Sequence, residues 1–264
     1  MSPWLLAVLG LMAYKYWSKK RGGSIPSVSP QTIPVILNSI CVIAGLIYLV
    51  SFNPSGRFFC VASAIVSSIY IIYTNYGLPK VSRAAIKVPL QEYVAQCLTG
   101  AEFPFLFFAM MFTNDYACQV GGGIIPFGIA DYLGILLILR RSLWFIGSHG
   151  SRAWVSNPVW GRYGNLAWAL LKSRETAVMS FVNIAEIFIG LWMTLLVITP
   201  ARQILNTFVY WNLLRIKYMA PRSRGSHIAA WSWFDGKTKG VRSAVPLLDK
   251  PVQIGVKWFN QQTA

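Results

Sequence analysis

Length, composition and charge already argue against most classes of soluble protein. The chain has 264 residues, of which 55% are hydrophobic and only 12% charged, and its mean hydropathy is +0.49. This balance argues against a soluble enzyme domain, whose surface must face water. Because 24 Lys and Arg residues stand against 8 Asp and Glu, the formal net charge is +16, and the apolar and basic residues must be segregated along the sequence.

The N-terminal part, residues 1–30, contains an apolar stretch at 4–14 followed by a basic and Ser/Pro/Gly-rich linker. The stretch is too short to cross a bilayer, has no basic start and precedes no small-residue cleavage site. We therefore expect a short embedded or interfacial segment rather than a cleaved signal peptide.

Five long apolar runs follow, each with at most one charged residue: 33–52, 58–76, 93–112, 124–139 and 177–199. About twenty helical residues are needed to cross a hydrocarbon core of about 30 Å. The runs therefore predict membrane-spanning helices, of which the fourth is short.

The distribution of basic residues predicts a sixth span. If residues 203–218 also cross, 22 of the 24 Lys and Arg residues fall on one face, and only Arg57 and Arg202 remain for the other. Lys and Arg accumulate in cytosolic loops, so we expect the basic loops and the C-terminus to be cytosolic. The predicted fold is an all-α, polytopic membrane protein with about six spans in three hairpins, over residues 31–219.

The basic tail, residues 220–264, shows amphipathic patterns. We expect a hinge at 222–225, a short interfacial helix at 226–234, and an amphipathic segment at 241–260 that Pro246 and Pro251 divide or kink. The predicted membrane-surface residues are Trp231, Phe234, Val241, Val245, Leu248, Lys250, Val252, Val256, Lys257, Trp258 and Phe259. The alternative is that this face packs on the protein's own cytosolic loops. Nucleic acid is disfavoured because the basic residues are dispersed and no binding motif accompanies them.

Three acids, Glu102, Asp131 and Glu186, are predicted near the middle of consecutive spans, and the five long apolar runs contain no basic residue to pair with them. Ionisable groups in a membrane suggest a proton or cation path. The alternative, which we favour, is that each acid is protonated or hydrogen-bonded to a nearby polar residue and fixes helix packing. The nearest polar candidates in sequence are Tyr132, Ser180, Asn183 and Thr194.

No other pattern predicts catalysis, a cofactor or a metal. The segment 147–151 contains adjacent Ser148 and His149, but without an orienting acid it is interpreted as a flexible loop. The four cysteines lie in or beside apolar runs without paired spacing, so we expect small buried side chains.

One stretch resembles a known family. The segment 183–218, with Glu-Ile-Phe at 186–188 and Tyr-Trp-Asn-Leu-Leu-Arg-Ile-Lys-Tyr at 210–218, is similar to the end of the Transmembrane protein 33 (Krüppel homologue 2) family, which includes the yeast pore membrane proteins. The resemblance implies a protein of the endoplasmic reticulum and nuclear envelope without known catalytic activity. It also implies reticulon-type or nuclear-pore partners and C-terminal amphipathic helices that bind curved membrane.

These observations favour a non-enzymatic protein that shapes or scaffolds a membrane and whose basic tail contacts anionic lipid headgroups. Two alternatives stay open. One is an ion or proton transporter, channel or channel regulator that uses the three acids, and the other is an accessory subunit of a larger membrane complex.

Overall fold

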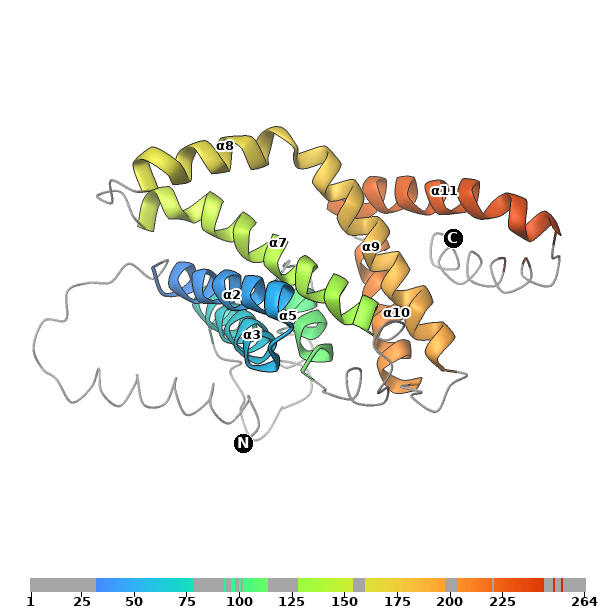
Figure 1. Ribbon diagram of the computed structural model, residues 1–264, viewed down its shortest axis with the longest axis horizontal. Helices are drawn as coiled ribbons and strands as arrows, with labels where there is room; N and C mark the ends of the chain where they lie inside the picture. Colours follow the sequence, from blue (N-terminus) through green and yellow to red (C-terminus); the bar gives the residue numbers. More distant parts are fainter. Residues whose placement is uncertain are drawn as a thin grey trace, which may run out of the picture. The chain divides into compact units, whose positions relative to one another are not determined.

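The computed structural model describes residues 32–77, 102–113, 128–153, 160–197, 204–219 and 221–244, with isolated positions at 93, 96–97, 100, 249 and 253. Within these residues every regular element is a helix (Figure 1). The predicted all-α fold is confirmed. The predicted N-terminal segment at 4–14 lies outside the described residues. The chain divides into two compact units, 1–173 and 174–264.

The first unit is built on a helical hairpin. Helix α2 (Thr32–Ser51) and helix α3 (Pro54–Tyr76) pack side by side, as Figure 1 shows in blue and cyan. The turn between them is short because the Asn53 side chain accepts a hydrogen bond from the Ser55 amide at 2.9 Å and Pro54 is the first helical residue. Both helices match predicted spans.

Small residues let the two hairpin helices approach closely. A Cβ on Gly56 would lie 2.9 Å from the backbone oxygen of Ala44, so only glycine fits there. Further along, the Cys41 and Cys60 sulfurs are 3.6 Å apart and the Asn38 amide donates to the Ser67 hydroxyl at 2.7 Å. Close approach through small residues is typical of helices that associate in membranes.

Helices α5 (Glu102–Met111) and α7 (Gly128–Ala153) pack on this hairpin, α5 against α3 and α7 mainly against α2. The expected loop at 147–151 is wrong, because these residues continue α7. Their glycines make room for tryptophans: the ring of Trp168 lies where a Cβ on Gly147 would stand, and Trp160 does the same at Gly150. The tryptophans belong to a π-helical turn, η1 (Trp160–Gly164), and to α8 (Asn165–Ser173).

The second unit contains α9 (Glu175–Leu196), α10 (Ile204–Met219) and α11 (Pro221–Ala244), which pack on one another. The expected hinge at 222–225 and the separate short helix at 226–234 are wrong, because α11 is one continuous helix. Pro221 occupies its first position, where proline costs no hydrogen bond. Most of the tail beyond Ala244 lies outside the described residues.

Three of the described helices are long and apolar enough to cross a membrane: Thr32–Ser51, Pro54–Tyr76 and Glu175–Leu196. Glu102–Met111 is a shorter apolar helix. The apolar helices are consistent with the predicted membrane protein. The sixth span at 203–218, which coincides with α10, stays a prediction.

Candidate functional site: the paired acids and the tail helix

The structure gives each of the three predicted acids a basic neighbour. Glu102 is the first residue of α5, Asp131 lies in the first turn of α7, and Glu186 lies midway along α9. Glu186 thus lies near the middle of its helix, as predicted. The mid-span positions of Glu102 and Asp131 stay predictions, because the residues directly before α5 and α7 lie outside the described part. The expectation that no basic residue pairs with these acids is wrong, because each pairs with a base from a neighbouring helix of the same unit.

Asp131 forms the most completely buried of these pairs. The Arg57 Nε atom donates to both carboxylate oxygens, at 2.9 and 3.0 Å, and the Tyr48 hydroxyl donates to Oδ2 at 2.7 Å. All three residues are buried. Arg57, which the charge distribution assigned to the far face, lies in the first turn of α3. The end of α2 and the starts of α3 and α7 thus meet at one ion pair.

Glu102 pairs with Arg141 of α7. The Arg141 guanidinium also lies 5.4 Å from the ring centroid of Phe105 and 5.3 Å from that of Phe145. Arginine over aromatic faces is a common packing arrangement, and here it surrounds the charge with rings from α5 and α7. This pair therefore links the two helices that pack on the first hairpin.

Glu186 is the centre of a cluster in the second unit. Its Oε1 lies 2.5 Å from the Lys217 Nζ of α10, and its Oε2 lies 3.8 Å from the His227 Nε2 of α11. The Tyr210 hydroxyl donates to the Glu186 backbone oxygen at 2.9 Å. Among the described residues, Oε2 has no hydrogen-bond partner although it is buried. The Glu186 carboxylate therefore approaches side chains from both neighbouring helices, and one of its oxygens accepts no hydrogen bond within the described part of the chain.

The His227 side chain is almost completely buried, and burial lowers its pKa from the ordinary value. The Glu186 carboxylate opposes this shift, and the Lys217 ammonium adds to it. Because an ordinary histidine titrates near pH 6.5, a lowered pKa keeps His227 neutral at neutral pH. The ion pair of the cluster is therefore between Glu186 and Lys217.

Two of the four polar residues that the sequence suggested as partners make other contacts. Thr194 accepts a hydrogen bond from the Trp211 indole at 2.9 Å, and Tyr132 stacks on Phe52 with ring centroids 6.3 Å apart. The actual partners were missed because they are distant in sequence. Asp131 and Arg57 are 74 residues apart, and Glu186 and Lys217 are 31 apart. A basic residue in the first or last turn of a neighbouring helix is the signal that could have suggested them.

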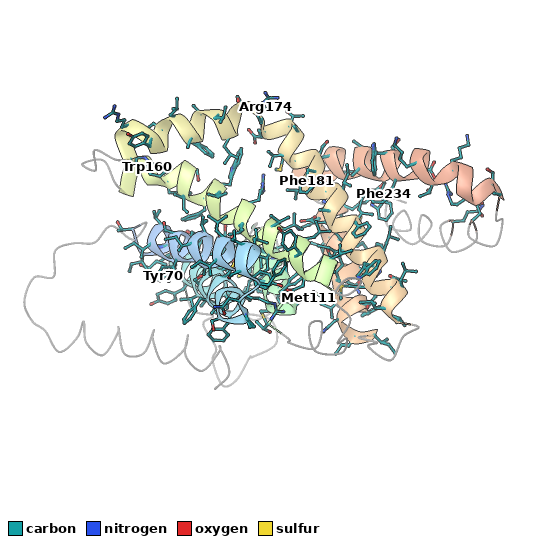
Figure 2. The ribbon with its side chains drawn as sticks, viewed as in Figure 1. Tyr70, Met111, Trp160, Arg174, Phe181 and Phe234 are labelled. Carbon is teal, nitrogen blue, oxygen red and sulfur yellow. The ribbon has the colours of Figure 1, made fainter. Side chains whose placement is uncertain are left out.

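The predicted membrane-surface residues of the tail are only partly described. Trp231 stacks on Trp211 of α10 at 6.1 Å, on the helix face that also carries buried His227 and Ala230. Phe234, which is labelled in Figure 2, has its ring centroid 5.2 Å from that of Trp233, in an edge-on arrangement. Val241 lies in the last turn of α11. The other eight predicted residues lie outside the described part: Val245, Leu248, Lys250, Val252, Val256, Lys257, Trp258 and Phe259. Membrane contact by this set stays a prediction.

Comparison with known protein families gives one match. The family described as Transmembrane protein 33/Nucleoporin POM33 matches residues 29–229, from just before α2 into the first half of α11. Comparison with curated proteins and with solved structures gave no significant match. The family is one of membrane proteins of the endoplasmic reticulum and nuclear pore membrane, and the three long apolar helices agree with it. Since the match covers most of the chain, the protein belongs to the Transmembrane protein 33/Nucleoporin POM33 family.

Proposed function

We propose that this protein is a non-enzymatic scaffold that shapes the membrane of the endoplasmic reticulum and nuclear envelope, and that its basic tail contacts the membrane surface. The observation that carries the proposal is the form of α11. Its first half packs on α9 and α10 through His227 and Ala230, whereas residues 235–240 are exposed and include Lys237 and Lys239. An anchored helix that presents basic residues at its free end is suited to hold the following amphipathic segment against anionic lipid.

The ion pairs support a scaffold over the transport alternative. A proton or cation path needs carboxylates that are open to the transported ion, whereas a carboxylate in an ion pair already has a basic partner. Here Asp131 is held by Arg57, Glu102 by Arg141 and Glu186 by Lys217. These pairs tie helices together, which is the function that a scaffold requires.

The proposal is tested by reconstituting the full chain in vesicles that contain phosphatidylserine and imaging their shape by electron cryomicroscopy. We expect tubules or highly curved vesicles, and we expect Lys250→Glu with Lys257→Glu to reduce them. The matched control is Lys80→Glu with Lys87→Glu, which changes the net charge equally in another basic stretch of the sequence. Vesicles that have the same shape with and without the protein would contradict the proposal. A proton flux that Glu186→Gln abolishes would favour transport instead.

A further inference from the structure

The segment formed by η1 and α8 has an inner face that is fixed on α7. Gly164, Trp168 and Leu171 are its only half-buried residues after Trp160, and they follow one another at helical spacing. The Trp168 ring packs edge-on against Trp144 of α7, with ring centroids 4.9 Å apart. The tryptophan contacts at Gly147 and Gly150 fix the orientation of the segment within the first unit.

The outer face of the same segment is apolar and exposed. Tyr163, Leu166 and Leu170 follow one another at i, i+3 and i+7, which places them along one stripe of the helix. Their exposed fractions are 60%, 72% and 68%. A row of large exposed apolar side chains on a helix is typical of a surface that is covered by lipid or by another protein.

Charge indicates what covers this stripe. Arg162 and Lys172 are exposed at the two ends of the segment, and the Arg162 guanidinium lies 5.5 Å from the ring centroid of Tyr163. From residue 132 to residue 174 the sequence contains no Asp or Glu, and Arg174, which directly follows the segment, is exposed as well. A basic surface with exposed Leu and Tyr is complementary to the headgroup layer of an anionic bilayer.

The segment lies directly before a candidate membrane span in the chain. Helix α8 ends at Ser173 and α9, which is long and apolar enough to cross a membrane, begins at Glu175. Figure 2 marks Trp160 at the start of the segment and Arg174 at the junction with α9. Because only Arg174 links the two helices, the end of α8 lies close to the start of α9, where the membrane boundary is expected.

We infer that residues 160–173 form a second membrane-surface anchor, in which Tyr163, Leu166 and Leu170 enter the headgroup layer of an anionic leaflet and Arg162 and Lys172 contact lipid phosphate or carboxylate groups. The inference rests on the membrane-embedded part of the proposed function, but not on curvature generation or on the tail. It differs from the tail contact because the segment lies inside the helical region, between α7 and α9.

The test uses the full chain in vesicles, with its four cysteines replaced by alanine. A fluorescent nitrobenzoxadiazole label is attached at Leu170→Cys on the apolar stripe or, as the matched control, at Asn165→Cys on the polar side of the same helix. Nitroxide lipids with a shallow spin label then quench whichever label lies in the bilayer. We expect quenching at position 170 to exceed that at position 165 roughly twofold or more.

Equal weak quenching at both positions would overturn the inference. Energy transfer between labels at position 170 that increases with protein density, in the absence of quenching by lipid, would also overturn it. The stripe would then be covered by a second copy of the protein. A label at Ile43→Cys, an exposed position in α2, is the internal reference. If the label at position 43 is quenched by deep nitroxide lipids and the label at position 170 is not quenched by shallow ones, the inferred anchor is wrong. The membrane-spanning part of the proposed function would still hold.

A second measurement keeps the native cysteines in case the substituted chain does not fold. Amide hydrogen exchange of residues 160–173 is compared between phosphatidylserine and phosphatidylcholine vesicles. We expect slower exchange on phosphatidylserine, and we expect Arg162→Gln with Lys172→Gln to remove the difference. Exchange that is the same on both lipids in the native chain would contradict the inference.

Discussion

Two buried carboxylates in this protein have very different surroundings. Asp131, in the first unit, receives two hydrogen bonds from a buried Arg57 and one from Tyr48, so both of its oxygens are used. Glu186, in the second unit, has one oxygen on a partly exposed Lys217 and another that only approaches neutral His227. The first arrangement is closed, whereas Oε2 in the second is free to accept a hydrogen bond.

The difference indicates separate roles for the two units. A closed pair fixes the arrangement of α2, α3 and α7, which suits a rigid membrane-embedded body. The Glu186 cluster joins α11, the first part of the basic tail, to α9 and α10. If the tail acts on the membrane, the cluster is the place where its attachment can be weakened by charge or pH.

The largest expected effect is at the closed pair. Replacing Asp131 by Asn leaves the buried Arg57 charge without its counter-ion, and losing one partner of a buried pair costs about 3–5 kcal/mol. Thermal unfolding in detergent should show a large fall in Tm. The double variant Arg57→Met with Asp131→Leu should recover at least part of this loss, because no uncompensated charge remains. A double variant as unstable as Asp131→Asn would show that the pair does more than balance its charges.

A second prediction concerns the hairpin that carries this pair. In Gly56→Ala the added Cβ would lie 2.9 Å from the Ala44 oxygen and 3.0 Å from the Tyr48 nitrogen, which are backbone atoms. Forcing the helices apart should cost about 1–3 kcal/mol, measured by thermal unfolding. The control is Gly236→Ala on α11, where no atom lies within 4 Å of the added Cβ. It should stabilise by up to about 1 kcal/mol through helix propensity. Equal losses at both glycines would refute the close packing.

At the Glu186 cluster we expect a smaller and asymmetric effect. Lys217→Met should cost about 1–2 kcal/mol, less than at Asp131, because the Lys217 side chain is 29% exposed and water already screens the pair. Glu186→Gln should cost less than Lys217→Met, since the released lysine can extend to water while a released Glu186 stays buried. Urea or thermal unfolding of both variants measures this order, and the reverse order would mean that Lys217 is the more buried partner.

The smallest expected effect is pH-dependent. Because burial lowers the pKa of His227 in the folded state, the unfolded chain binds a proton at higher pH than the folded one. This contribution to stability is complete above about pH 6.5 and is lost progressively as pH falls below that value. Tm should therefore fall more between pH 7.5 and pH 5.5 in the native chain than in His227→Gln. An equal fall in both would show that other groups cause the pH dependence.

The sequence alone predicts the helices better than their contacts. The apolar runs at 33–52 and 177–199 correspond closely to α2 and α9, because the length of an apolar run reflects the thickness of the bilayer. The partners Arg57 and Lys217 were missed because helical periodicity shows which face of a helix is apolar, but not which faces meet.

Glycine-rich segments were the other source of error. The motif at 147–151 looks like a loop in sequence, yet its glycines accommodate Trp160 and Trp168 from a later segment. The tail glycines Gly225 and Gly236 lie inside a continuous helix. Local propensity cannot anticipate such cases, because tertiary packing or a favourable helix start at Pro221 outweighs the cost of each glycine.

The most direct test of the proposed scaffold function is curvature sorting. The fluorescently labelled full chain is reconstituted in giant vesicles that contain phosphatidylserine, and a narrow membrane tube is pulled from each vesicle. We expect the protein to be more concentrated on the tube than on the vesicle. We expect Lys250→Glu with Lys257→Glu to lower this enrichment, and Lys80→Glu with Lys87→Glu to leave it unchanged. An equal concentration on tube and vesicle for the native chain would contradict it.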